Sequence, residues 1–348
     1  MPLASSISLP ARSDPPVRTI ARAWRRLTGG TTRGSDRGRR TLIACSGGGD
    51  SCGLVLALAA AVSGPGQHFV VAHIVHDLRP SDQALQDRDA AAGLAAGLGL
   101  PFVEASIRVK AAGGNPEAAA RRLRYQDLRR LAREQGCPYL ATAHHAQDQL
   151  ESIVMGLLRG SGPRGLAGIA PRGQSTQACL IRPALDVCRA DLQRLCRGAG
   201  WVWCEDATNA DQSRLRAAVR HQIAPALERL RPGAAARAAR SASVLRDAAG
   251  LIQDRADFLL AAATPSKEPD LIWARPQLRF ERAVVLGAVL QTAAARLSKG
   301  RDSFGWAVLD PVIRAIRSRS GTPHRFQLRG IEVMVDSNVV QIRAVTRA

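Results

Sequence analysis

The sequence predicts an α/β protein: a doubly wound parallel sheet, followed by a mainly helical domain that ends in a β-hairpin. Between residue 41 and about residue 205, short apolar runs alternate with longer segments of helical period, which is the pattern of repeated β-α units. The apolar runs are nearly continuous, as expected for strands whose sheet is covered on both faces. After about residue 215 the pattern changes to successive helices, so a chain of 348 residues is expected to hold more than one domain.

The expected strands are four short apolar runs, "TLIAC" (41–45), "HFVVAHIV" (68–75), "FVEASIRV" (102–109) and "YLATA" (139–143). Candidate helices lie between them at 51–62, 83–98 and 115–135. The last begins with Asn115 as its cap and Pro116 in its first turn. Ligands of such sheets bind beyond the carboxyl ends of the strands, so functional residues are expected directly after Cys45, Val75 and Ala143.

The chain divides by pattern into three parts: a basic, partly disordered leader (1–40), the α/β domain (41–215) and a helical domain (216–348). In the helical domain we expect helices at 216–230, 237–263, 279–297 and 306–317. The closing segment alternates apolar and polar residues around Asp336, Ser337 and Asn338, which predicts the terminal hairpin.

The composition favours a polyanionic partner. A total of 49 basic residues against 29 acidic ones gives a formal net charge of +20, and nucleic acid is the commonest partner of such a protein. A generally basic surface that binds nothing remains the alternative. No apolar window is long enough to span a bilayer, so no membrane contact and a cytoplasmic location are expected. The seven cysteines contain no C-x-x-C pair, which argues against a disulfide framework or a paired thiolate metal site.

The stretch "SGGGDS" (46–51) lies between the first strand and the first helix. Glycines let backbone N–H groups converge on an anion, serine hydroxyls add donors, and the helix amino terminus adds positive dipole. The loop lacks the Walker A and Rossmann patterns. Its acid, Asp50, would repel a bare phosphate and fits Mg²⁺ bridging to a nucleotide. We therefore expect the phosphates of a nucleotide at Ser46, Gly47, Gly48, Gly49, Asp50 and Ser51, with a tight turn as the alternative.

Two carboxylates follow the fourth strand. Asp148 and Glu151 are spaced i, i+3 on the next helix, so both are expected on one face directed at the rim of the sheet, where they can bind cations. A solvated helix face is the alternative. His144 lies at the carboxyl end of the strand, and both a structural hydrogen bond and a nucleotide contact stay open for it. Arg122 and Arg124 on the 115–135 helix are candidates for phosphate or carboxylate contacts.

Several motifs in order resemble the tRNA(Ile)-lysidine synthase family, within the Rossmann-like N-type ATP pyrophosphatases. They are "SGGGDS" (46–51), "HIVHDLRPSD" (73–82), "NPEAAARRLRYQDL" (115–128), "TAHHAQDQLESIVMGLLRGSGPRGLAGI" (142–169), "LIRPALDVCRADL" (180–192) and "WCEDATNADQSRLRAAVRHQIAPAL" (203–227). The family commonly has Ala-Asp-Asp-Gln and Arg-Asn where this chain has Ala146-Gln147-Asp148-Gln149 and Arg216-Ala217. These departures put local hydrogen bonding in question more than the reaction.

The resemblance implies a ligase that adenylates the wobble cytidine of tRNA(Ile) and joins lysine to its C2, which changes the codon read from AUG to AUA. ATP, Mg²⁺, free L-lysine and tRNA with a CAU anticodon would be its ligands. Asp50, Asp148 and Glu151 would be catalytic, the last two holding lysine. His73 and His144 would contact ATP, and Arg216 and Arg220 would contact tRNA or phosphate.

A tRNA cytidine thiolase and a non-catalytic RNA-binding relative of the same fold remain alternatives. The missing C-x-x-C disfavours the thiolase, and the retained carboxylates disfavour the non-catalytic relative. The oligomeric state stays open, with a homodimer as one option.

Overall fold

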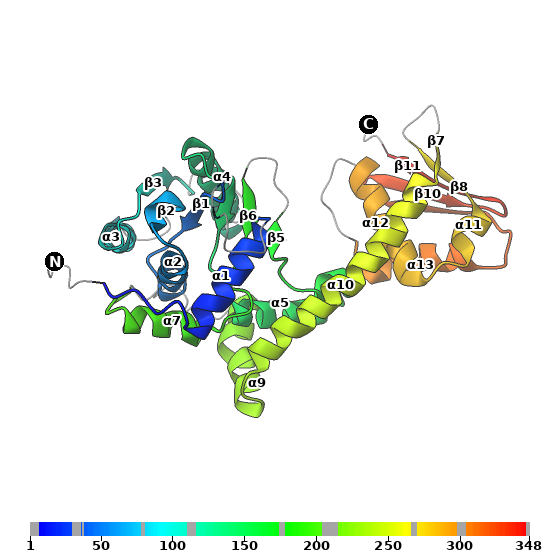
Figure 1. Cartoon of the computed structure of the whole chain (residues 1–348). Coiled ribbons are helices and arrows are strands. Elements are labelled where there is room, and N and C mark those ends of the chain that lie inside the picture. Colours follow the sequence, from blue (N-terminus) through cyan, green and yellow to red (C-terminus); the bar gives the residue numbers. More distant parts are fainter. Residues whose placement is uncertain are drawn as a thin grey trace. The chain divides into compact units, whose positions relative to one another are not determined.

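The computed structural model describes residues 7–29, 36, 38–77, 81–109, 116–173, 178–203, 215–265, 270–297 and 304–345. The chain forms two compact units (Figure 1). The first comprises Met1–Glu151 with Ile169–Arg240, and the second comprises Ser152–Gly168 with Ser241–Ala348. Among the described residues, no helix has the length and apolar character needed to cross a membrane.

The first unit is built on a six-stranded sheet of order β3-β2-β1-β4-β6-β5. All neighbouring strands are parallel except β5 and β6. This confirms the predicted doubly wound sheet and its four expected strands. The last two strands were not predicted, because runs of two and three residues carry no readable period. The strands are β1 (Thr41–Ala44), β2 (Phe69–His76), β3 (Phe102–Ile107), β4 (Tyr139–Ala141), β5 (Arg172–Gly173) and β6 (Cys179–Ile181).

Helices cover both faces of this sheet. A core on one face joins α1, α2, α3 and α7, and a second core joins the strands to α4 on the other. The helices α2 and α7 approach closely at Gly53, where an added Cβ would lie 2.5 Å from the carbonyl oxygen of Leu192. The bounds are α2 (Gly49–Ala61), α3 (Ser81–Gly97), α4 (Pro116–Glu134), α5 (Ala146–Leu158) and α7 (Arg189–Gly198), with a 3-10 turn η1 (Pro65–Gln67) before β2.

The expected leader contains a helix of the core. The helix α1 (Pro15–Leu27) places Val17, Ile20 and Trp24 among the buried side chains of the first unit. Trp24 Nε1 donates a hydrogen bond to Thr41 Oγ1 at 3.0 Å, which ties the helix to the start of β1. The segment expected as a partly disordered leader thus contributes a helix to the core. Its apolar residues recur at helical spacing, but the surrounding arginines and prolines masked that period.

The segment after residue 215 begins within the first unit. It forms α8 (Leu215–Ala218), a π-helical turn η3 (Val219–Ile223) and α9 (Ala224–Leu230). Pro225 has no N–H to continue the helical hydrogen bonds, which accounts for the widened turn before it. The last segment of the first compact unit ends at Arg240, later in the chain than the domain boundary at 216 expected from the sequence.

The second unit packs helices on a five-stranded antiparallel sheet of order β7-β8-β11-β10-β9. The predicted hairpin is confirmed as β10 and β11, with Asp336 Oδ1 accepting bonds from the N–H groups of Asn338 and Val339. The other three strands were not predicted. The elements are α6 (Pro163–Leu166), α10 (Ala234–Ala261, shared with the first unit), β7 (Thr264–Pro265), β8 (Leu271–Ala274), α11 (Arg275–Arg279), α12 (Ala283–Leu297), α13 (Trp306–Arg317), β9 (His324–Leu328), β10 (Ile331–Val335) and β11 (Val339–Ala344).

Candidate active site

The strand order places the site between β1 and β4. The chain leaves β1 for β2 on one side and later returns to β4 on the other, so the carboxyl ends of β1 and β4 flank a topological switch point. The glycine loop follows β1, and two histidines and the helix α5 follow β4. The sequence therefore brings the two predicted motifs to one edge of the sheet.

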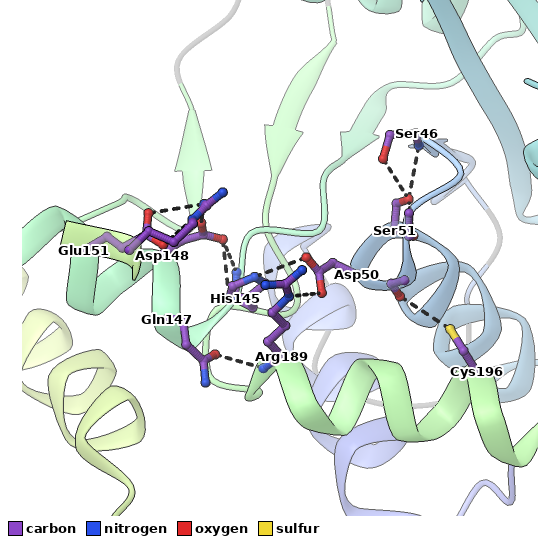
Figure 2. Close-up of polar contacts among 12 residues, drawn as sticks. Ser46, Asp50, Ser51, His145, Gln147, Asp148, Glu151, Arg189 and Cys196 are labelled. Carbon is purple, nitrogen blue, oxygen red and sulfur yellow. Dashed lines mark hydrogen bonds and ion pairs between the residues drawn. The ribbon is translucent and has the colours of Figure 1, made fainter. Parts of the chain in front are cut away.

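The glycine loop is held by a small hydrogen-bond network (Figure 2). Ser51 Oγ accepts from the N–H of Ser46 at 3.1 Å and donates to the carbonyl oxygen of Gly48 at 2.9 Å. Gly47 has a φ of +83°, and a Cβ there would lie 2.7 Å from the carbonyl oxygen of Asp87. Only glycine fits this position, because the backbone is left-handed and α3 passes directly beside it. The loop shape needed for an anion cradle is thus built in.

Asp50 projects from the first turn of α2 toward two basic groups (Figure 2). Arg189 Nε lies 3.3 Å from its Oδ1, and His145 Nε2 lies 3.5 Å from its Oδ2. The N–H of Arg189 in turn donates to Gln147 Oε1 at 2.8 Å, so the residue that departs from the family pattern anchors the start of α7. Arg189 was not among the site residues predicted from the sequence. It follows β6, and recognition of that strand would have pointed to its carboxyl end.

The two carboxylates of α5 are buried and paired with arginines. Asp148 and Glu151 are 7% and 2% exposed, which excludes the alternative of a solvated helix face. Arg220 Nε lies 2.7 Å from Glu151 Oε1, and Arg216 Nε lies 3.2 Å from Glu151 Oε2. Asp148 Oδ1 lies 3.4 Å from Arg220 Nη2. Two buried acids and two partly exposed guanidinium groups thus form an ionic cluster beside the loop.

His145 connects Asp50 to this cluster. The backbone N–H of His145 donates to Asp148 Oδ2 at 2.9 Å, and the imidazole ring of His145 lies between Asp50 and Asp148. Burial disfavours the charged ring, but the two carboxylates outweigh that cost and raise the pKa of His145. Burial likewise tends to raise the pKa of Asp148, yet the neighbouring histidines and Arg220 lower it. The arrangement stabilises a charged imidazole between two ionised carboxylates.

His144 faces a different environment. Its Nδ1 lies 2.9 Å from Thr142 Oγ1. Burial, together with the charges of Arg182, Arg121 and Arg216, lowers the pKa of His144 to about 4 against the attraction of Asp148. The ring is therefore neutral near pH 7. Its hydrogen bond to Thr142 supports a structural role for His144, and a contact with the nucleotide stays a prediction.

The remaining predicted site residues are more dispersed. His73 is buried, and its Nδ1 donates to the carbonyl oxygen of Cys45 at 2.9 Å, which ties β2 to the end of β1. Burial lowers the pKa of His73, so this ring is also neutral. Arg122 and Arg124 are exposed on α4. Asp206 and Asn209, which belong to the last family-like motif, lie outside the described residues.

The residues fit a magnesium ion held mainly by a nucleotide. In the described ranges, no group of three or more His, Cys, Asp or Glu side chains is arranged to hold a metal. Mg²⁺ in nucleotide sites usually takes one or two carboxylates and completes its shell with phosphates and water. Asp50, at the end of an anion-binding loop, offers such a carboxylate once it releases Arg189.

Comparisons with known proteins agree with this geometry. The PP-loop domain family matches residues 19–227. A tRNA(Ile)-lysidine synthase of Bordetella parapertussis is 42% identical over 228 residues, which cover 63% of this chain and 65% of the relative's length. One of Salinispora arenicola is 37% identical over 251 residues, covering 71% of this chain and 73% of the relative.

Among solved structures, a U34-tRNA thiolase of Methanococcus maripaludis matches with a TM-score of 0.52. It is 16% identical, over 66% of this chain and 79% of the thiolase, so this likeness concerns the fold alone. The site geometry, the PP-loop match and the sequence relatives together lead to one assignment: the chain belongs to the tRNA(Ile)-lysidine synthase family of PP-loop proteins.

Proposed function

We propose that the protein joins free L-lysine to C2 of the wobble cytidine of a tRNA(Ile) with a CAU anticodon, at the expense of ATP. The observation that carries this proposal is the linkage of Asp50 to Asp148 through His145, because it puts an anion-binding loop and a cation-binding acid pair in one site. A reaction that joins an activated nucleotide to an amino acid needs both kinds of binding.

In the first step, the C2 oxygen of cytidine attacks the α-phosphate of ATP and pyrophosphate leaves. Backbone N–H groups of the glycine loop and the positive end of α2 hold the phosphates. Mg²⁺, held by Asp50 together with the phosphates, would offset their negative charge. Arg189 moves from Asp50 to the leaving pyrophosphate, since its side chain is half exposed and its backbone is fixed by Gln147.

In the second step, the ε-amine of lysine attacks C2 and AMP leaves. Asp148 and Glu151 hold the lysine by its α-ammonium, which leaves the ε-amine free to lose its proton and react. Arg216 and Arg220 neutralise the two buried acids until lysine enters, and then turn toward AMP or the RNA. Converting the C2 oxygen into part of AMP supplies the good leaving group.

The partners follow from this chemistry. The substrates are tRNA(Ile), ATP and lysine, and we infer a cytoplasmic location because tRNA is modified there.

Incubation of the pure protein with unmodified tRNA(Ile) transcript, ATP, Mg²⁺ and radiolabelled lysine tests the proposal. Label should enter the tRNA only when ATP and Mg²⁺ are both present, because activation must precede attack by the amine. Incorporation without ATP, or uptake of sulfur in place of lysine, contradicts a lysine ligase.

A further inference from the structure

Three arginines surround Tyr125 on α4, apart from the Asp50 and Asp148 cluster. The guanidinium carbons of Arg121 and Arg129 lie 5.3 and 5.7 Å from the centre of the Tyr125 ring. Arg182, directly after β6, donates from Nη1 to the carbonyl oxygen of Ala170 at 2.7 Å, and the Tyr125 side chain acts electrostatically on its guanidinium group. Two guanidinium groups therefore lie over one aromatic ring, and a third interacts electrostatically with the same side chain.

These charges lack a negative counterpart. Among the side chains that the structure describes, no ion pair joins a carboxylate to Arg121, Arg129 or Arg182. Arg182 is 9% exposed, and its Nε and that of Arg129 are buried without a hydrogen-bond partner. Burial and the nearby charge of Arg121 lower the pKa of Arg182, although Tyr125 opposes the effect. A buried charge and buried donors left unpaired are costly, so the cluster around Arg182 is incomplete as a purely structural feature.

The next arginine on the same helix gives the contrast. Arg130 Nε lies 2.9 Å from Asp127 Oδ1 and its Nη1 lies 2.9 Å from Glu134 Oε1. Its charge is balanced within the helix in the ordinary i, i+3 and i, i+4 manner. The imbalance around Tyr125 is thus a local property and does not follow from the basic composition alone.

The cluster borders the active site through His144. The charges of Arg121 and Arg182 both act on the His144 ring, and His145, the next residue, contacts Asp50. A ligand at the cluster would therefore act on the histidine pair next to the nucleotide loop, and it would contribute negative charge where the described side chains supply none.

We propose that Arg121, Arg129, Arg182 and Tyr125 form a second phosphate-binding pocket, separate from the glycine loop. Guanidinium groups match phosphate oxygens with paired N–H donors, and the Tyr125 hydroxyl adds a further donor or acceptor. The phosphate comes either from the tRNA backbone near the wobble cytidine or from the nucleotide. This inference rests on the proposed function for the choice of those two sources.

Binding measurements with Arg121→Gln test the pocket. Arg121 is exposed, so the variant should fold, and Arg130→Gln is the matched control on the same helix. Affinity is measured separately for unmodified tRNA(Ile) transcript and for a non-hydrolysable ATP analogue, each without the other ligands. Arg182→Gln, checked for an unchanged thermal transition, extends the test to the buried member.

If the phosphate belongs to tRNA, Arg121→Gln should weaken tRNA binding about tenfold and reduce its salt dependence by about one counterion, with unchanged ATP affinity. If the phosphate belongs to the nucleotide, Arg121→Gln should weaken binding of the ATP analogue by a similar factor and leave the tRNA affinity unchanged. Unchanged affinity for both probes, or an effect equal to that of Arg130→Gln, overturns the pocket. Failure of the wild-type protein to bind either probe would instead contradict the proposed function.

Discussion

In the proposed mechanism, the first chemical step depends most directly on Asp50. Replacing it with Asn removes the carboxylate that would share Mg²⁺ with the nucleotide while keeping the side-chain shape. We expect Asp50→Asn to reduce pyrophosphate release by about a hundredfold or more, with tRNA affinity unchanged, because the lost charge faces the phosphates and not the RNA surface. Quantifying pyrophosphate and tRNA binding in parallel, with Asp127→Asn on α4 as control, checks this. Near-normal release would remove Asp50 from the mechanism.

In the proposed mechanism, Glu151 acts in the second step and not in the first, so its replacement distinguishes the two steps. In Glu151→Gln a charge-assisted contact to an ammonium group becomes a neutral one, at a cost of about 2 kcal/mol, or roughly thirtyfold in apparent lysine affinity. Adenylation should survive, so the variant should accumulate adenylated tRNA at subsaturating lysine. Steady-state kinetics over a range of lysine concentrations measure the effect, with the exposed Glu134→Gln as control. Loss of pyrophosphate release at every lysine concentration would instead assign Glu151 to the nucleotide.

His144 predicts a pH dependence of stability. Its pKa is about 4 in the folded protein against 6.5 for the free side chain, so the unfolded state binds a proton first on acidification. The stability that the neutral ring contributes is therefore complete above pH 6.5 and is lost between pH 6.5 and about pH 4, by up to about 3 kcal/mol. Burial is the main cause of this pKa shift, Arg182, Arg121 and Arg216 add to it, and Asp148 opposes it.

Denaturant unfolding at several pH values measures this contribution. His144→Gln should flatten the decline between pH 6.5 and pH 4, whereas the exposed His324→Gln should not. Equal slopes for the wild-type protein and both variants would show that His144 titrates normally.

At the scale of elements, α2 and α7 pack so closely at Gly53 that a larger side chain does not fit there. Gly53→Ala would place a Cβ 2.5 Å from the backbone oxygen of Leu192, so the two helices must separate, at a cost of about 1–3 kcal/mol. Gly250→Ala on α10 meets nothing within 4 Å and should stabilise by about 0.5–1 kcal/mol, because alanine restricts the unfolded chain. Unfolding experiments should therefore show a lower free energy of unfolding for Gly53→Ala and a higher one for Gly250→Ala. An unchanged free energy of unfolding for Gly53→Ala would mean that the two helices separate at little cost.

Much of the first unit could be predicted from the sequence. The strands from 41 to 143 and the helices between them were readable, because each apolar run is continuous and each helix is long. The helix α1 was missed, because proline and arginine dominate its composition although Trp24 is fully buried. The strands β5 and β6 are too short for any periodic signal, and with them Arg189 was missed.

The site itself was predicted in part. Its loop and acid pair were located by their positions after β1 and β4, since parallel strands bring their carboxyl ends together. The pairing of Arg216 and Arg220 with Glu151 could not be predicted, because residues more than 60 positions apart in the chain carry no local signal of contact. The same holds for the link between Arg189 and Asp50, which depends on how α7 packs.

At the scale of the whole molecule, the net charge of +20 predicts a steep salt dependence of tRNA binding. Each phosphate contact releases counterions, so the logarithm of affinity should fall with the logarithm of salt concentration with a slope of about −3 or steeper. The apparent affinity for lysine should change little, because its contacts are buried. Titrations between low and moderate salt measure both, and a flat dependence for tRNA would mean that the arginines do not face the RNA.

The most direct test of the central claim is to locate the lysine on the RNA. The protein is incubated with ATP, Mg²⁺, labelled lysine and a tRNA(Ile) transcript with a CAU anticodon, and a transcript with a changed wobble base serves as control. Nucleoside digestion followed by mass spectrometry should find lysine joined to the wobble cytidine of the first transcript and to no nucleoside of the second. Absence of label from both transcripts, or lysine at another nucleotide, would contradict the account.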